Sequence, residues 1–377
     1  MAQLSPLAVH DAFDPARLTQ ARRLLGMTKK ALAERLGVTA AAVGQYEAGI
    51  TRPRPDLLAR LADSLEVPLA FFVAGRPHGR LDTSMAHFRS LRSTRVYQRE
   101  KAVAATEQVW ELTHALDKRV QLPDVHLPDD PPTNPPDGLP GGGRDPVAAA
   151  RGLRARWGLA GGPISHLVRR MEANGIVVVT PPPDPDSDTV DAFSTSRLPR
   201  PIVVLTRNRA DDVYRHRFTA AHELGHLVLH ADASPGDVLQ EREADAFAAE
   251  FLTPRTSILP SLPRRADLTR LAELQRIWGV SVHSLLYRCR ETGLLSDSAA
   301  SRAYQRLHTL RQQPGFRTEP LAGYPGEQPA LLAQAFELAA EHGLTLRALA
   351  AELAWTLPRC RTLLGLSNSK PILTLVN

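Results

Sequence analysis

Two histidines in the stretch AAHELGHLVLH, residues 220–230, have the spacing of metal ligands. On a helix, His222 and His226 are four residues apart and therefore project from one face, where both imidazoles can reach the same zinc ion. Glu223 follows the first histidine and would lie beside the open position of the metal. There it would take a proton from zinc-bound water and return it to the leaving amine of a peptide. The stretch predicts either this hydrolytic zinc site or, on a plainer interpretation, a buried amphipathic helix with satisfied histidines.

A catalytic zinc site needs a third protein ligand, and an acidic segment downstream offers one. The segment EREADAFAAEFLTP, residues 241–254, begins fifteen residues after His226. Glu241 and Asp245 share a helix face at positions i and i+4. Glu241 would complete the ligand set, and Asp245 would accept a hydrogen bond from a ligand imidazole and so fix its tautomer. Glu243 points elsewhere and is the alternative ligand.

Three other side chains near the motif are candidates for contact with the substrate or with an oxyanion, namely His230, Tyr214 and Arg217. His230 lies four residues past His226, and its alternative is a structural role. The sequence does not select among the three.

The elements that would position these residues can be read from apolar periodicity. Two β-branched runs, GIVVVT (175–180) and PIVVLT (201–206), predict paired strands of one sheet. Residues 84–120 have helical spacing and no proline, which predicts a long helix or a helical pair. Further helical patterns cover 147–159, 164–175, 215–252, 267–293 and 329–363. No internal repeat stands out.

Charge is distributed unevenly along the 377 residues, whose net charge is +6. Residues 1–120 contain 18 Lys and Arg against 12 Asp and Glu, whereas residues 121–377 contain 28 of each kind. A basic domain joined to a neutral one indicates that the N-terminal part meets a polyanion, most simply double-stranded DNA.

The N-terminal stretch 17–72 divides at glycines and prolines into pieces the size of short helices. Thr28 and Thr39 are well placed as N-caps, and the short turns between the pieces are typical of a helix-turn-helix. The third helix, 39–47, would present Ala40, Ala41, Gly44 and Gln45 to base edges. A compact helical domain used for dimerisation or protein contact is the alternative.

This stretch resembles the helix-turn-helix domain of the Cro/cI-type, XRE family of regulators, through its whole pattern of glycines, apolar positions and Y-E-x-G. The resemblance implies that Gln45 reads bases and that Ala40 and Ala41 contact thymine methyl groups. Thr39, at the start of the third helix, is also expected to face DNA. The residues expected to hold phosphates are Lys29, Lys30, Arg52 and Arg54.

The two zinc segments, together with DAFS (191–194) and WGVSVHSLLYRCRETGLL (278–295), resemble the ImmA/IrrE family of zinc-dependent metallopeptidases. The resemblance implies a zincin-like fold, in which a small sheet packs on the H-E-x-x-H helix and its edge strand receives an extended peptide. DAFS would lie at or beside that edge. It also implies Zn²⁺ as cofactor and limited cleavage of a protein, which in characterised relatives is a repressor of a mobile element or of a stress regulon.

The expected fold is a multidomain α+β protein, with an all-α helix-turn-helix domain, a zincin-like domain and a helical C-terminal region. Residues 122–146 are too rich in proline and glycine for a helix or central strand, and a flexible linker is expected there. The expected divisions are 1–75 for the helix-turn-helix domain, 76–121 for a helical connector that could support dimerisation, 122–146 for the linker, 147–300 for the zincin-like domain and 301–377 for the C-terminal helices.

The expected function is that of a DNA-binding transcriptional regulator fused to a zinc endopeptidase with a protein substrate, and a homodimer is expected if DNA is read as paired half-sites. Neither a membrane span nor a secretory signal is apparent, which predicts a cytoplasmic protein. Two distant cysteines, Cys289 and Cys360, argue against a disulfide framework. The alternatives are a non-proteolytic transcription factor whose zincin domain senses a metal, ligand or partner, and a component of a toxin-antitoxin module.

Overall fold

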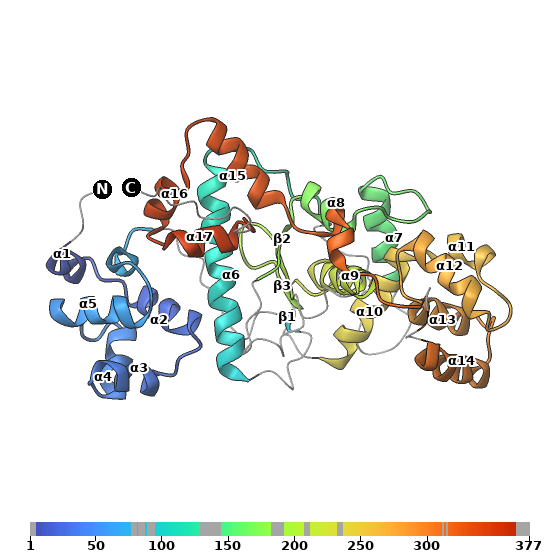
Figure 1. The fold of residues 1–377 in the computed structure, drawn as a ribbon, viewed down its shortest axis with the longest axis horizontal. Helices are drawn as coiled ribbons and strands as arrows, with labels where there is room; N and C mark the ends of the chain where they lie inside the picture. Colours follow the sequence, from blue (N-terminus) through green and yellow to red (C-terminus); the bar gives the residue numbers. More distant parts are fainter. Residues whose placement is uncertain are drawn as a thin grey trace, which may run out of the picture. The chain divides into compact units, whose positions relative to one another are not determined.

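The computed structural model of the chain divides into two units (Figure 1). The residues that the structure describes are 5–76, 81, 87–88, 95–128, 145–181, 192–206, 212–231, 237–310, 313 and 316–366. The first unit comprises Met1–Thr83, Arg92–Leu122 and Ala330–Asn377, and the second comprises Ser84–Leu91 and Pro123–Pro329. Most of the predicted linker 122–146 lies outside the described residues. A membrane-spanning helix is not found in the described part of the chain.

The first unit begins with a bundle of short helices. These are α1 (Pro6–Asp11), α2 (Pro15–Leu24), α3 (Lys29–Leu36), α4 (Ala40–Glu47), α5 (Pro55–Ser64) and the 3₁₀ turn η1 (Leu69–Phe72). The predicted N-caps are confirmed, because the Thr28 hydroxyl accepts from Ala31 N and the Thr39 hydroxyl from Ala42 N, each at 3.1 Å. Between α3 and α4, Gly37 adopts the left-handed conformation that ends α3. The helix-turn-helix predicted here is therefore present.

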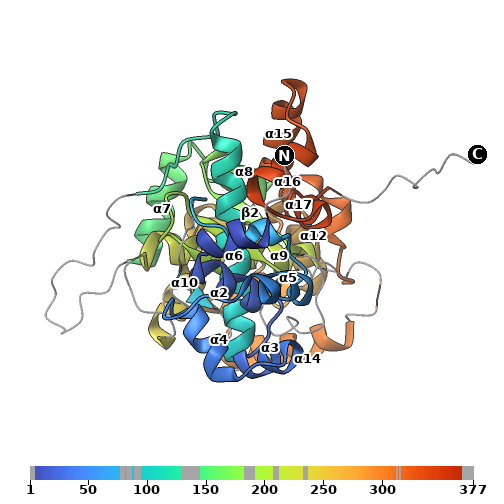
Figure 2. The same ribbon diagram turned by 90° about the vertical axis from the view of Figure 1, so that its left-hand side faces the viewer.

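The long helix α6 (Val96–Asp117) packs against this bundle, where it contacts α2 (Figures 1 and 2). The contact includes a buried polar cluster. Arg17 of α2 donates to Glu111 of α6 at 2.5 Å, and Gln20 donates to the same carboxylate at 2.9 Å. Because a buried charge is costly unless it is paired and hydrogen-bonded, this cluster fixes α2 on α6 in one register.

Three C-terminal helices belong to the first unit as well, namely α15 (Leu331–Glu341), α16 (Leu346–Leu353) and α17 (Leu357–Leu363). Both α15 and α16 pack against α6, and Arg119, just after α6, donates to Glu352 of α16 at 2.6 Å. The division therefore differs from the expected C-terminal region 301–377, which the structure splits near residue 330. The reason is that the apolar faces of α15 and α16 are buried on α6.

The second unit is built on a four-stranded sheet of order β1-β3-β4-β2. Its strands are β1 (His87–Phe88), β2 (Val177–Val179), β3 (Ala192–Thr195) and β4 (Ile202–Leu205). The predicted pairing of runs 175–180 and 201–206 is confirmed, since β2 and β4 pair in parallel, while β3 pairs antiparallel with β4.

One expectation about this sheet is confirmed and one is corrected. DAFS contributes β3, which lies beside the edge strand β1, in agreement with a place at or beside the edge. The outer position beside β3 is taken by β1, from a stretch expected to be helical, with His87 opposite Ser194. In the described part of 84–120, helix α6 begins only at Val96.

In the second unit, helix α9 (Val213–Leu229) runs beside α10 (Val238–Leu252). The others are α7 (Pro146–Arg156), α8 (Leu167–Ala173), α11 (Arg255–Ile258), α12 (Leu268–Trp278), α13 (Val282–Glu291) and α14 (Asp297–Leu310), with the 3₁₀ turns η5 (Leu259–Ser261), η6 (Leu321–Gly323) and η7 (Pro325–Glu327). Helix α9 also contacts α7 and α8, while α11 to α14 lie together on one side (Figure 1).

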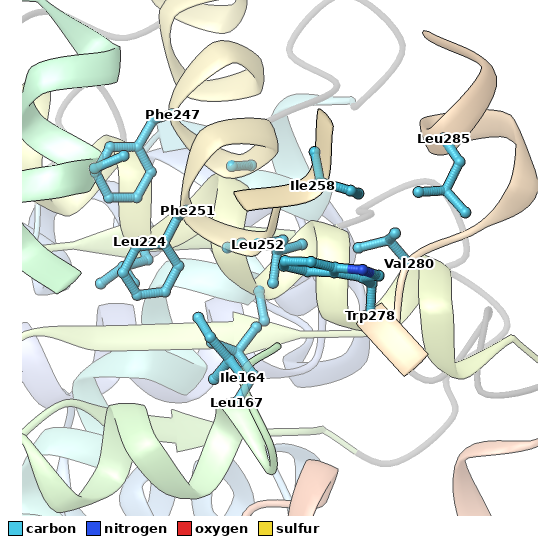
Figure 3. Close-up of a cluster of buried hydrophobic side chains, with 14 of the residues drawn as sticks. Ile164, Leu167, Leu224, Phe247, Phe251, Leu252, Ile258, Trp278, Val280 and Leu285 are labelled. Atoms are coloured by element: carbon cyan, nitrogen blue, oxygen red, sulfur yellow. The ribbon is translucent and has the colours of Figure 1, made fainter. Parts of the chain in front are cut away.

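The core between these elements is apolar and aromatic (Figure 3). Leu224 of α9 lies with Phe247 and Phe251 of α10, all fully buried. The rings of Phe247 and Phe251 stack at a centroid distance of 5.5 Å. This packing holds α9 and α10 together, and those two helices carry the predicted metal ligands.

Candidate metal centre and nucleic-acid interface

Helix α9 carries the H-E-x-x-H stretch and is buried on nearly all sides, because β3, β4, α7, α8 and α10 all pack against it. Close approach of α10 requires a small residue, and Gly225 supplies it. A Cβ atom at Gly225 would lie 3.2 Å from the Ala244 Cα and 3.1 Å from the Phe247 ring. The glycine therefore serves the contact between the two helices.

His222, His226 and Glu241 converge from α9 and α10. The two Nε2 atoms are 3.1 Å apart, and each lies 3.4 Å from an oxygen of Glu241. Tetrahedral ligands at zinc-to-nitrogen distances of about 2.0–2.1 Å stand roughly 3.3 Å from one another. The spacing of the three donor groups therefore fits one zinc ion.

The charge of Glu241 suits this arrangement. Burial alone would raise the pKa of Glu241, but the hydrogen bonds with His222 and His226, and their charges, outweigh burial and lower the pKa to about 2. The Glu241 side chain is 31% exposed, while the imidazoles of His222 and His226 are almost fully buried. The carboxylate is thus ionised throughout the pH range in which the imidazoles are neutral.

Each imidazole is oriented through its other nitrogen. His222 Nδ1 lies 2.8 Å from Asp245 Oδ1, the partner that the sequence predicts. His226 Nδ1 lies 3.0 Å from His230 Nδ1, and His230 Nε2 lies 2.8 Å from Glu243 Oε2. If His230 Nε2–H donates a hydrogen bond to Glu243, His230 Nδ1 can accept one from His226 Nδ1–H. The Nε2 lone pairs of His222 and His226 are then both directed at the cluster.

This chain of contacts bears on the alternatives left open for two residues. His230 is buried and bound on both ring nitrogens, so an orienting role replaces contact with an oxyanion. Glu243 lies on His230 and outside the group of converging donor atoms, which contains Glu241.

Ser194 is a site residue that the sequence analysis did not single out. Its hydroxyl donates to Glu223 Oε2 at 2.8 Å, and both side chains are fully buried. Ser194 belongs to the DAFS stretch on β3, for which a place at or beside the sheet edge was the only expectation. The hydrogen bond shows instead that β3 holds the carboxylate of Glu223.

Tyr214 and Arg217, the other oxyanion candidates, are bound elsewhere in the second unit. The Tyr214 hydroxyl donates to Glu319 at 2.9 Å, and burial followed by this hydrogen bond raises the pKa of Tyr214. Arg217 donates to Gly279 O at 2.8 Å, to Ile164 O at 2.6 Å and to the Glu327 carboxylate. A structural role therefore replaces the expected contact with an oxyanion for both side chains.

Arg217→Ala is expected to lower the free energy of unfolding by about 3–5 kcal/mol, because it leaves Glu327 buried without its cationic partner. Urea unfolding followed by circular dichroism measures this loss. Arg270→Ala, which breaks an exposed pair with Glu273, is the matched control and should cost less than about 1 kcal/mol. Equal losses for the two variants would contradict a structural role for Arg217.

In the first unit, the exposed residues of α4 include Ala40, Ala41 and Gln45, the expected readers of bases, while the Thr39 hydroxyl caps the helix. Helix α4 is fixed to α2 by Arg22, which donates to both oxygens of Glu47, at 2.5 and 3.1 Å. This buried pair was not predicted, although Glu47 belongs to the Y-E-x-G pattern.

The four expected phosphate ligands lie around α4 and are exposed. Lys29 is 3.5 Å from Glu47, Lys30 is 4.0 Å from Glu34, and Arg54 is 3.7 Å from Asp56. Arg52 donates to Asp11 O at 3.0 Å. The Lys30 and Arg54 pairs are exposed on both sides, and exposed ion pairs are weak enough for a phosphate to replace them.

Comparison with protein families gives two matches. The model described as "Helix-turn-helix" matches residues 18–72, and the peptidase family model described as "IrrE N-terminal-like domain" matches residues 171–290. Curated proteins give no match. The second match spans β2, β3, β4, α9 and α10, and hence every residue of the metal cluster. The chain therefore has the architecture of the ImmA/IrrE family joined to an XRE-type helix-turn-helix domain.

Proposed function

We propose that the chain is a DNA-binding transcriptional regulator whose second unit is a zinc-dependent endopeptidase that cleaves a protein substrate, a repressor. The observation that carries the proposal is the convergence of His222, His226 and Glu241, with donor atoms within 4.8 Å of one another. Glu223, on the same helix, provides the acid-base group that a purely structural zinc site would not need.

Zinc held by these three residues would supply a Lewis acid that polarises a peptide carbonyl and lowers the pKa of water. Glu223 accepts the proton from the attacking water and donates it to the leaving amine. Ser194 keeps the Glu223 carboxylate in place during both transfers, since its hydroxyl donates to Oε2. Asp245 and His230 hold the two ligand imidazoles in the tautomer that exposes Nε2.

The polypeptide substrate would bind in extended form along the sheet, as strand addition requires. The outer position beside β3 is taken by β1 of the same chain, so a substrate strand would have to replace β1 there. A substrate strand in the position of β1 would lie opposite Ser194, whose hydroxyl donates a hydrogen bond to Glu223.

The test is the zinc content of the purified full-length protein, followed by incubation of the zinc-loaded protein with repressors of its source organism. One zinc per chain and limited cleavage, both lost in His226→Ala, are expected. Wild-type protein that binds no zinc after reconstitution would overturn the peptidase. Zinc binding without cleavage of any repressor, in a protein that still binds DNA, would favour a sensor.

Acid is expected to release the metal below about pH 6, because protons compete with zinc for the imidazole nitrogens of His222 and His226. Glu241 does not set this limit, since its pKa is lowered to about 2 and its carboxylate remains ionised. Equilibrium dialysis between pH 4.5 and pH 8 measures the release, and circular dichroism at each pH tests whether the chain stays folded. Full zinc content at pH 4.5 would contradict ligation by the two imidazoles.

A further inference from the structure

The C-terminal helices of the first unit repeat the sequence pattern of the helix-turn-helix. Residues 26–39 read GMTKKALAERLGVT and residues 343–356 read GLTLRALAAELAWT, with seven of fourteen positions identical and no gap. This corrects the expectation that the chain has no internal repeat; the repeat is inconspicuous because the glycine of the turn, Gly37, is replaced by Ala354 in the second copy.

The backbone follows the same register. Helix α3 (Lys29–Leu36) corresponds residue for residue to α16 (Leu346–Leu353), and α4 and α17 begin at the corresponding residues Ala40 and Leu357. The N-caps correspond too, since the Thr345 hydroxyl accepts from Ala348 N at 3.1 Å and the Thr356 hydroxyl from Arg359 N at 3.4 Å.

The turn between the two helices is also retained. Gly37 has φ 66° and ψ 35°, and the corresponding Ala354 has φ 52° and ψ 43°. Alanine rarely adopts this left-handed conformation, so packing on both sides must enforce it. The residues that fix the angle between the helices are buried in both copies: Leu32, Leu36 and Val43 in the first, Leu349, Leu353 and Cys360 in the second.

The preceding helices complete the correspondence. Helix α2 precedes α3 as α15 precedes α16, and both α2 and α15 pack against α6. One long helix therefore holds two three-helix units of the same design within the first unit. The family match for a helix-turn-helix covers the first copy only, at residues 18–72.

We propose that residues 331–366 form a second helix-turn-helix that contacts double-stranded DNA through α17, so that one chain offers two reading helices. This goes beyond the DNA contact expected of α4. Exposed Arg361 stands where α4 has Gly44, a position that faces base edges. Exposed Arg347 stands where the first copy has Lys30, an expected phosphate ligand.

Charge favours DNA over a protein partner for this surface. Residues 345–366 contain three arginines and one acidic residue, Glu352, which is paired with Arg119. The corresponding residues 28–49 contain three basic and two acidic residues. Arg359 donates to Gln108 of α6 at 2.7 Å, so Arg347 and Arg361 are the two arginines of the second copy that are exposed where a duplex would lie. Exposed Leu357 and Pro358 replace Ala40 and Ala41, and apolar groups there can contact thymine methyl groups.

The test uses the full-length protein and duplexes that it selects from a random-sequence pool. Hydroxyl-radical footprinting of the wild type should show two protected segments. Arg361→Ala should remove one segment and weaken binding about tenfold, as expected when an arginine contact to a base is lost. Gln45→Ala should affect the other segment. Arg347→Ala should reduce the slope of affinity against salt by about 1. The matched control is Gln334→Ala, at an exposed position of α15, which should change nothing.

Three results would overturn the proposal and are distinguishable. A single protected segment that depends on Gln45 and is unaffected by Arg361→Ala would leave α4 as the DNA reader and refute α17. Failure of the wild-type chain to bind any duplex would refute DNA binding by both copies. If Arg361→Ala leaves the footprint intact but converts a dimer into a monomer in sedimentation, α17 serves self-association, and DNA contact by α17 is refuted.

Discussion

Glu223→Gln is expected to lower kcat for cleavage of the protein substrate by about 10²–10⁴-fold or more while the zinc content stays at one per chain. The substitution keeps the shape of the side chain and an oxygen that can accept from the Ser194 hydroxyl. It removes the group that accepts a proton, and Glu223 is not among the converging ligands. Single-turnover cleavage followed by gel electrophoresis, with zinc measured in the same samples, separates catalysis from metal binding.

The charge-matched control for this variant is Glu273→Gln on α12, because the Glu273 side chain is 56% exposed and pairs with Arg270. It should cleave at the wild-type rate. Ser194→Ala offers an intermediate test, since it should reduce kcat less than Glu223→Gln does and leave zinc binding unchanged. Full activity in Glu223→Gln would show that another group transfers the proton.

Glu241→Gln is expected to abolish stoichiometric zinc binding, because an amide is a poor zinc ligand and the two remaining imidazoles do not complete a three-ligand site. Glu243→Gln removes the same charge two residues away on the same helix. It should only weaken zinc binding, by about 10–100-fold, because Glu243 acts through His230 on His226. Competition with a chelator of known zinc affinity measures both effects.

The opposite order of zinc affinities in these two variants would change the assignment of the third ligand. Zinc lost from Glu243→Gln and kept by Glu241→Gln would make Glu243 the third ligand. Equal zinc affinity in both variants and the wild type would show that neither carboxylate binds metal. Thermal unfolding with and without zinc checks that each variant folds, since a metal that binds only the native state raises its Tm.

What could be predicted from the sequence was mostly local. The caps at Thr28 and Thr39 and the runs that became β2 and β4 follow from signals within a few residues. The same holds for His222 and His226, whose spacing on one helix defines their common face. Glu241 was identified because its helix follows closely and has a periodic pattern.

What could not be predicted depends on partners distant in the chain. Arg217 binds Glu327, 110 residues away in the sequence, and Tyr214 binds Glu319, 105 residues away. Neither contact is therefore visible in a local sequence pattern. Strand β1 pairs with β3 across more than 100 residues, which is why β1 and its edge position were not foreseen. The second helix-turn-helix does have a sequence pattern, but alanine at position 354 hides the turn, since glycine is the usual signal there.

The alternation of the two units along the chain has a practical consequence. The chain passes from one unit to the other after Thr83, Leu91, Leu122 and Pro329. A single break within 122–146 would therefore leave β1 of the sheet on one fragment and α15 to α17 on the other. Truncation at Pro329 would damage the DNA-binding unit and not the peptidase. A single cut at any of the four crossings therefore removes part of the first unit, so that unit cannot be separated intact from the rest of the chain by one cut, in proteolysis or in a gene fusion.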